Sequence, residues 1–197
     1  MKVDYLEIGT CDFEIADGHI DPSKQYLFVE PIDTYLDRLP SGDNVIKLNA
    51  AVSYKECVMD MFFVNESDIQ KYNLPYWVKG CNRLNEKHPT VLKLLSGMNL
   101  PDLFSVKQVT VTTFNKLMRS NGVSEIVNLK IDTEGHDHVI MLDVIKYMNE
   151  HELNIDTIKF EYIPAFNNTN ALDGICMELS KMYPNQKLIG DNMFLFK

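Results

Sequence analysis

The sequence contains no long apolar run and no closely paired cysteines, and each absence excludes a class of protein. No stretch approaches the roughly 18–20 consecutive apolar residues that a membrane-spanning helix requires. The four cysteines lie far apart, without the Cys-x-x-Cys spacing that indicates a zinc or redox motif. We therefore expect reduced thiols, as is usual in cytosolic proteins.

Positive charge is also scarce. The chain has 19 lysine and arginine residues against 28 aspartate and glutamate residues, which gives a net charge of −9. Basic side chains are needed to bind DNA or RNA without sequence preference and to dock on an anionic membrane surface. Residues 1–5 lead directly into strand-like sequence, without an apolar signal segment. We therefore expect an acidic cytoplasmic protein without a nucleic-acid or membrane partner.

The composition is that of an ordinary folded domain. The 197 residues are 45% hydrophobic and 24% charged, which is enough to bury a core without additional crosslinks. A chain of this length is expected to form a single domain, here residues 1–197. No internal repeat or linker-like stretch divides the sequence.

Short apolar runs alternate with helix-like patterns, which is typical of an α/β fold with a mostly parallel sheet. The end of the chain differs, because the turn Gly190-Asp191-Asn192 is too short to connect parallel strands. The sequence therefore predicts a C-terminal antiparallel hairpin. The predicted strands are residues 3–8, 25–29, 44–48, 57–64, 105–111, 126–131, 155–162, 187–189 and 193–196, and the predicted helices are residues 32–39, 113–120, 137–150 and 171–182.

Residues 65–103 interrupt this alternation. The segment is rich in proline and asparagine, and only residues 91–95 have a convincing helical pattern. A long irregular segment inside a domain is often functional, so one hypothesis is a substrate-side insertion that contacts the acceptor through Tyr76, Trp77 and Arg83. The alternative is a plain surface excursion in which the aromatic pair closes a small cluster.

The turn after the first strand indicates the charge of a ligand. In open parallel sheets, ligands bind beyond the carboxyl ends of the strands. A dinucleotide site needs several glycines there to accommodate a pyrophosphate, but this turn has only Gly9, with Glu7, Asp12 and Glu14 around it. These acids favour a cationic ligand and argue against a nicotinamide-dependent oxidoreductase.

The position of Glu30 indicates that the ligand contains a nucleoside. It ends the second strand, 21 residues after Gly9, close to the usual offset of about 20 residues for an acid that binds ribose hydroxyls. An adenosine that carries a positive charge and no phosphate describes S-adenosylmethionine. The alternative is structural, with Gly9 forming only a tight turn and Glu30 only a solvated strand end.

The segment from Asp132 to His138 carries the densest group of reactive side chains, and three hypotheses are open. Asp132, Glu134, His136 and His138 could bind a metal ion, but the histidines lack a known ligand spacing, so no bound metal is expected. Asp137 could cap the following helix while the histidines are solvated. Alternatively, Asp132 and Glu134 could face the reacting centre, where one carboxylate acts as a general base.

Several motifs resemble one known family. Residues 129–135, Leu-Lys-Ile-Asp-Thr-Glu-Gly, resemble the LKIDxEG signature of the FkbM-type S-adenosylmethionine-dependent methyltransferases. Weaker similarities lie in residues 7–12 (D/E-x-G-A-N-D), 29–31 (xEP), 48–52 (NxAV) and 111–117 (strand and TLDxL). Two residues depart from the family pattern: Phe13 stands at the usual second glycine, and Asn115 at the usual aspartate.

The resemblance implies a class I, Rossmann-like methyltransferase with a seven-stranded sheet, which uses S-adenosylmethionine to methylate a hydroxyl of a small molecule or sugar. Phe13 supports an alternative, a non-catalytic adenosine-binding module with a decayed site. The residues expected to contact the cofactor are Glu7, Gly9, Thr10, Asp12, Phe13, Glu30, Pro31, Ile32, Asn49, Ala50, Ala51 and Asp132.

The catalytic residues are expected at the end of a central strand, residues 126–131. Asp132 and Glu134 are predicted to flank the transferred methyl group, with Glu134 as the base that takes the acceptor proton. His136 is the second candidate, because the ordinary pKa of histidine is close to neutrality. Glu161, after the next strand, is predicted to complete an acidic wall that binds the acceptor.

Overall fold

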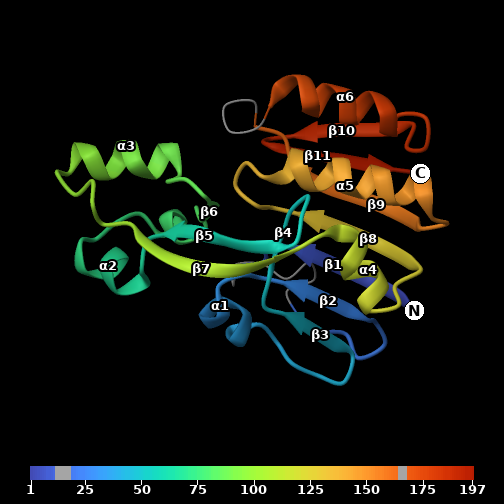
Figure 1. Cartoon of the computed structure of the whole chain (residues 1–197), viewed down its shortest axis with the longest axis horizontal. Coiled ribbons are helices and arrows are strands. Elements are labelled where there is room, and N and C mark those ends of the chain that lie inside the picture. The colour runs from blue at the N-terminus through green and yellow to red at the C-terminus, as the bar shows by residue number, and fades with distance from the viewer. Residues whose placement is uncertain (12–18, 164–167) are drawn as a thin grey trace. The chain divides into compact units, whose positions relative to one another are not determined.

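Two compact units make up the protein, and each is described separately. The computed structural model describes residues 1–11, 19–163 and 168–197 (Figure 1). The first unit comprises Met1–Cys57 and Thr110–Lys197, and the second comprises Val58–Val109. None of the helices in the described ranges is long and apolar enough to cross a membrane.

The first unit is built on a seven-stranded sheet with the order β10-β11-β9-β8-β1-β2-β3. Strands β3, β2, β1, β8 and β9 are parallel, whereas β11 is antiparallel to both β9 and β10. The predicted parallel sheet with a C-terminal antiparallel hairpin is confirmed, and β8 is central. The strands are β1 (Lys2–Ile8), β2 (Tyr26–Val29), β3 (Val45–Leu48), β8 (Glu125–Ile131), β9 (Asn154–Glu161), β10 (Asn185–Ile189) and β11 (Asn192–Phe196).

The hairpin differs from the prediction in one detail. Asn192 pairs with Ile189 as part of β11, so the connection contains only Gly190 and Asp191. Gly190 has a φ of 57°, a left-handed conformation that glycine adopts without strain in such short turns. The tighter turn leaves the predicted pairing of the strands unchanged.

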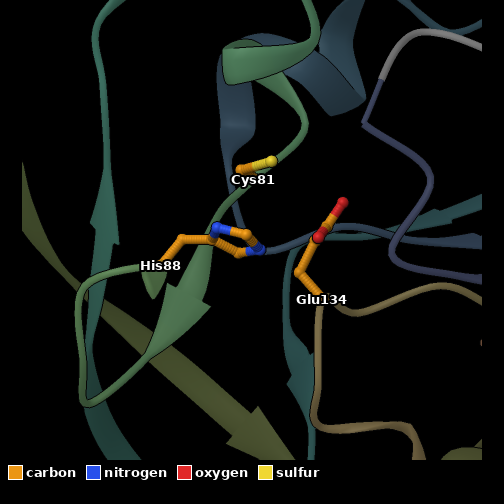
Figure 2. Close-up of side chains that lie close together, drawn as sticks. All are labelled: Cys81, His88 and Glu134. Carbon is orange, nitrogen blue, oxygen red and sulfur yellow. The ribbon is translucent and has the colours of Figure 1, made fainter. Parts of the chain in front are cut away.

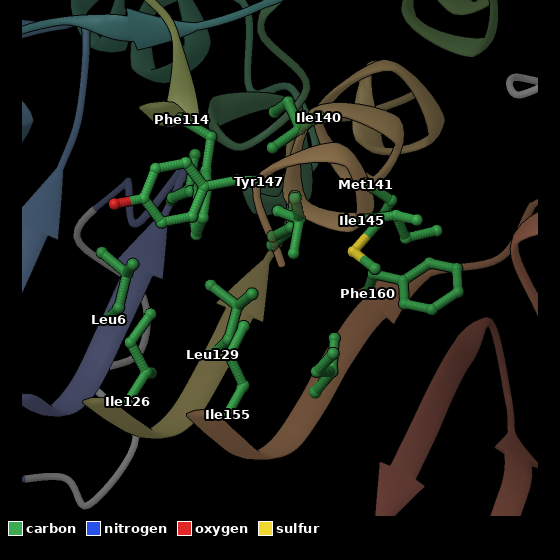
Figure 3. Packing of buried hydrophobic residues seen from close by; sticks show 14 of the residues in the cluster. Leu6, Phe114, Ile126, Leu129, Ile140, Met141, Ile145, Tyr147, Ile155 and Phe160 are labelled. Carbon is green, nitrogen blue, oxygen red and sulfur yellow. The ribbon is translucent and has the colours of Figure 1, made fainter. Parts of the chain in front are cut away.

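Helices cover both faces of this sheet, which explains why β2 is buried along its whole length. Leu27 and Val29 belong to the main core, whereas Tyr26 and Phe28 pack with Leu36 of α1 on the opposite face. The main core joins the sheet to the longest helix, α5, through Leu129, Phe160, Ile140, Met141, Ile145 and others (Figure 3). The helices of this unit are α1 (Asp33–Arg38), α4 (Phe114–Ser120), α5 (Asp137–Glu150) and α6 (Thr169–Leu179).

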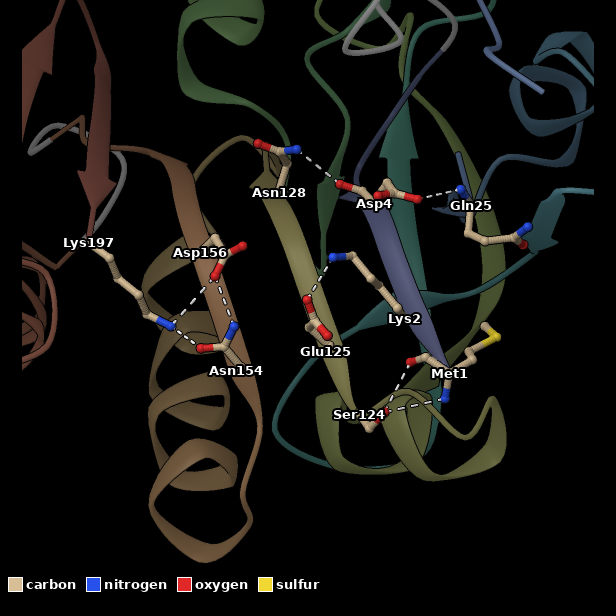
Figure 4. A network of polar contacts seen from close by, with 10 residues as sticks. All are labelled: Met1, Lys2, Asp4, Gln25, Ser124, Glu125, Asn128, Asn154, Asp156 and Lys197. Atoms are coloured by element: carbon tan, nitrogen blue, oxygen red, sulfur yellow. Dashed lines mark hydrogen bonds and ion pairs between the residues drawn. The ribbon is translucent and has the colours of Figure 1, made fainter. Parts of the chain in front are cut away.

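The amino ends of the strands carry exposed polar pairs (Figure 4). Lys2 Nζ lies 2.8 Å from Glu125 Oε1, and the Gln25 amide donates to Asp4 Oδ2 at 2.8 Å. The side chain of Asn128 donates to the Asp4 carbonyl at 3.0 Å. Exposed pairs of this kind contribute about 0–1 kcal/mol each. They support the alignment of neighbouring strands at this end.

The second unit has a core of its own, although its sequence pattern is weak. The buried residues that form this core are Val64, Ile69, Leu74, Val78, Cys81, Val91 and Leu95. The predicted helix at residues 91–95 is present within α3, but α2 was not predicted, because Ile69 is its only buried residue. The elements are β5 (Cys57–Phe63), α2 (Glu66–Lys71), the 3-10 helix η1 (Tyr76–Lys79), β6 (Arg83–Leu84), α3 (Pro89–Gly97) and β7 (Ser105–Thr112).

Strands β5 and β7 connect this unit to the rest of the chain. In the first unit, the carboxyl end of β7 pairs in parallel with the short strand β4 (Ala51–Val52), which the sequence did not predict. Residues 65–103 all belong to the second unit. The role of that segment as an insertion in a single methyltransferase domain stays a prediction.

Candidate active site

The turn after β1 lies directly against the turn after β8. Gly9 has a φ of 78°, and a Cβ atom added there would clash with the carbonyl oxygen of Asp132 and lie 2.9 Å from Thr133 Cγ2. The Asp132 amide donates to the Ile8 carbonyl at 3.0 Å, which continues the strand pairing up to this point. Only glycine meets both the conformational and the steric requirement. The site is therefore built around a contact between two backbone segments.

Glu30, at the end of β2, is a buried carboxylate held by backbone amides. Its side chain is 4% exposed; Oε2 accepts a hydrogen bond from Cys11 N at 2.8 Å, and Oε1 accepts one from Ile32 N at 2.9 Å. Asn49 donates to the carbonyls of Glu30 and Pro31 at 3.0 and 3.1 Å and so fixes the same turn. Backbone amides from two turns therefore fix the position of this carboxylate.

The other residues predicted to bind the cofactor lie at the same strand ends or beyond the described ranges. Glu7 and Thr10 are buried, with 1% and 3% exposure, and Ala51 is buried in β4. Asp12 and Phe13 fall within residues 12–18, outside the described residues. The contacts of all these residues with a cofactor stay predictions.

Three carboxylates meet at the ends of β8 and β9. Asp132, Glu134 and Glu161 each place one oxygen within 4.8 Å of the other two. Glu134 has a φ of 55°, a left-handed conformation that costs roughly 1–2 kcal/mol for a residue with a side chain, and Gly135 follows with a φ of 104°. Backbone strain of this kind is concentrated at functional sites. Figure 2 shows Glu134 projecting from its turn.

Asp137 connects the two segments that carry these carboxylates. It is completely buried, and its Oδ2 accepts hydrogen bonds from Thr133 N at 3.2 Å and Thr133 Oγ1 at 2.7 Å. Its Oδ1 accepts one from Glu161 N at 3.1 Å. The hypothesis that Asp137 caps α5 is wrong, because the N-cap position is His136. This bridge was not predicted from the sequence, although the spacing of Thr133 and Asp137 across a glycine turn is a usable signal.

Burial of several acids together raises their pKa values. Removal from water raises the pKa of Glu161 to about 9, and the nearby charges of Asp137, Glu134 and Asp132 add to the shift. Removal from water also raises the pKa of Asp137 to about 6, against the hydrogen bonds from Thr133, which lower it. Glu161 therefore keeps its proton at neutral pH when only these neighbours surround it.

His136 is oriented toward a serine rather than grouped with the acids. Its Nε2 lies 2.8 Å from Oγ of Ser53, a fully buried residue whose amide donates to the Thr112 carbonyl at 2.9 Å. Both His136 and His138 are half-buried rather than solvated. The metal hypothesis that combined Asp132 and Glu134 with histidines therefore differs from the observed grouping, in which Glu161 is the third residue.

The residues predicted to bind the acceptor from the second unit lie on η1 and β6. Tyr76 and Trp77 are 65% and 45% exposed on η1, whereas Arg83 Nη2 lies 2.5 Å from Glu86 Oε1. In the same unit, Cys81 and His88 are buried side by side, with their potential ligand atoms within 4.8 Å (Figure 2). Substrate contacts of Tyr76, Trp77 and Arg83 stay predictions.

The first unit is thus an α/β protein whose buried acids lie at the carboxyl ends of parallel strands, the position at which such folds bind ligands. The family model of the FkbM methyltransferase domain matches residues 7–182, which is most of the chain. The chain therefore belongs to the FkbM methyltransferase family, and the predicted resemblance is confirmed. No curated protein and no solved structure is significantly similar to it.

Proposed function

We propose that the protein is a class I, Rossmann-like methyltransferase that uses S-adenosylmethionine to methylate a hydroxyl of a small molecule or sugar. Membership of the FkbM family supports methyl transfer, and the seven-stranded sheet with one terminal antiparallel hairpin supports the fold class. The observation that carries the choice of cofactor is Glu30, a buried acid whose carboxylate is held by backbone amides at the end of β2.

The residues around Glu30 fit an adenosine that carries a positive charge. An acid at the end of β2, 21 residues after Gly9, suits the two ribose hydroxyls, and Gly9 allows the β1 turn to lie against the backbone of Asp132. Asn49 and Ala50 lie beyond β3, where the adenine is expected. When bound, S-adenosylmethionine would supply an electrophilic methyl group on a sulfonium centre, and the carboxylates at the ends of β1 and β8 favour that charge.

The protein must also orient the acceptor and remove its proton. Asp132 and Glu134 stand at the end of the central strand, and Glu134 is our candidate for the general base. His136 is the alternative, although its contact with Ser53 points to a role in positioning. Glu161 is proposed to bind the acceptor, together with Tyr76, Trp77 and Arg83 from the second unit.

Binding of the demethylated cofactor tests the first half of this proposal. We expect S-adenosylhomocysteine, and not NAD, to bind and to raise the melting temperature. Glu30→Gln removes the charge without changing the shape and should weaken binding by roughly 10–150-fold, since hydrogen bonds to charged groups contribute about 1.5–3 kcal/mol. Asp37→Asn, an exposed acid on α1, is the matched control and should bind as the wild type does. Equal affinity of Glu30→Gln would overturn the assignment.

Turnover tests the second half. Incubation with isotope-labelled S-adenosylmethionine and a metabolite extract should yield a methylated product that mass spectrometry identifies. Cofactor binding without any such product would instead support a non-catalytic cofactor-binding module.

A further inference from the structure

We propose that Asp132, Glu134 and Glu161 form a binding site for one divalent cation, Mg²⁺ or Mn²⁺. One carboxylate oxygen of each residue lies within 4.8 Å of the others, so a single ion placed among them can contact all three. The ligands come from the ends of two neighbouring parallel strands, β8 and β9, within one compact unit.

Glu161 provides an independent indication of a ligand. Its side chain is 8% exposed, and Oε2 is buried and accepts no hydrogen bond from the described residues. Buried polar atoms normally have a partner, and a carboxylate without one is costly. Its carboxyl group faces two further carboxylates, whose negative charges oppose its ionisation. A divalent cation would supply the missing partner and offset the repulsion.

Asp137 holds the three ligands in position without being one of them. Its hydrogen bonds to Thr133 on one side and to the Glu161 amide on the other tie the two ligand-bearing segments together. Partners of this kind, one step away from the ion, normally orient metal ligands. Lys130 Nζ lies 3.8 Å from Asp132 Oδ2, too far for a direct hydrogen bond, and an ion of higher charge at closer range would compete with it.

The donor atoms define the kind of ion. Three carboxylates without imidazole or thiolate suit hard cations such as Mg²⁺, Mn²⁺ and Ca²⁺. Three protein ligands leave positions on a six-coordinate ion for water or for oxygens of another molecule. The sequence predicted no metal because the histidines lacked ligand spacing, and Glu161, the residue that completes the set, is distant in sequence from Glu134.

An occupied site would also polarise an acceptor hydroxyl next to the end of β8 and make it easier to deprotonate. This extension rests on the proposed function, whereas cation binding itself does not. The cation can therefore be measured without cofactor or acceptor, so failure of methyl transfer and failure of cation binding are separate results.

Titration of the EDTA-treated full chain with Mn²⁺, followed by electron paramagnetic resonance of the unbound ion, tests the proposal. We expect one Mn²⁺ per chain, displaced competitively by Mg²⁺. Asp132→Asn, Glu134→Gln and Glu161→Gln should each weaken binding at least tenfold, whereas Glu152→Gln, which removes an exposed acid elsewhere, should leave it unchanged. Circular dichroism establishes that each variant is folded, and the three variants lie on two separate segments. No stoichiometric binding at millimolar Mn²⁺, or affinity unchanged in all three variants, would overturn the proposal.

Discussion

The backbone amide of Glu161 donates a hydrogen bond of 3.1 Å to Asp137 Oδ1, although the two residues are 24 positions apart in the chain. Through this bond, the first turn of α5 fixes the end of β9 relative to the turn after β8. The carboxylates of the candidate active site are therefore positioned by a fourth acid that is itself completely buried. The first two predictions concern this arrangement.

Asp137→Asn should destabilise the protein by about 1–3 kcal/mol, because the amide nitrogen cannot accept from donors that Asp137 now satisfies on both of its oxygens. Urea unfolding at a fixed pH of 8 measures the change in free energy. Glu150→Gln, an exposed change at the other end of α5, is the control and should have almost no effect. A stability of Asp137→Asn equal to that of the wild type would mean that these hydrogen bonds do not hold the site.

The stability of the metal-free protein should fall as the pH rises. Burial raises the folded-state pKa of Asp137 from 3.8 to about 6 and that of Glu161 from 4.5 to about 9, so the folded state binds more protons than the unfolded state between these values. The free energy of unfolding then decreases with pH, by at most ~1.4 kcal/mol per pH unit for each proton. Above pH 6, the contribution of Glu161 to this pH dependence should exceed that of Asp137.

Urea unfolding in EDTA at several pH values from 6 to 9 measures this slope, and Glu161→Gln should flatten it. The same variant should also be more stable than the wild type at pH 8, because glutamine is neutral in both states and needs no proton uptake on folding. If the free energy of unfolding changes with pH equally in the wild type and the variant, Glu161 is not the group that takes up a proton on folding.

Gly9→Ala should be strongly destabilising, because the new Cβ would clash with the Asp132 carbonyl at a φ of 78°. The conformation alone costs roughly 1–2 kcal/mol, and displacement of the backbone adds to this. Gly174→Ala is a matched control in α6, where the new Cβ meets no atom within 4 Å. That change should stabilise the protein by about 0.5–1 kcal/mol. Thermal unfolding of both variants shows whether the two substitutions change stability in opposite directions. A small loss of stability in Gly9→Ala would contradict the proposed backbone contact.

Glu134→Gln should retain S-adenosylhomocysteine affinity but lose roughly 10²-fold or more in turnover, the usual contribution of a general base. Single-turnover kinetics with labelled cofactor, combined with calorimetric binding, separates the two quantities. His136→Ala is the comparison, since His136 is the second candidate for the base and its ring contacts Ser53. Full activity in Glu134→Gln with loss in His136→Ala would transfer the role of base to the imidazole.

The sequence predicted the features that depend on short-range pattern. Apolar runs located the strands, and the brevity of the last turn predicted its antiparallel hairpin. Gly9 and Glu30 were found because each follows directly after a strand whose end could be read from the pattern. The number of strands in the sheet came from the resemblance to a family, and their order was not predicted.

Contacts between distant segments were predicted only in part. Glu161 was expected to extend the acidic wall of Asp132 and Glu134 because it ends the strand next to β8, but its connection to Thr133 through Asp137 was not predicted. The pairing of His136 with Ser53 likewise requires the position of β4, a strand of two residues without a periodic pattern. An aspartate at the start of a helix is typical of a helix cap, so the sequence suggested that role for Asp137. Its complete burial in the structure indicates a different role, the connection between the turn after β8 and the end of β9.

The contact between Gly9 and Asp132 involves main-chain atoms, so it does not depend on which side chain stands at position 132. Substitutions among the acids beyond β8 can change the chemistry offered to an acceptor while the spacing to the β1 turn stays constant. That spacing depends on a single glycine. Engineering of acceptor selectivity can accordingly alter residues after β8 and β9 without disturbing the geometry on the β1 and β2 side.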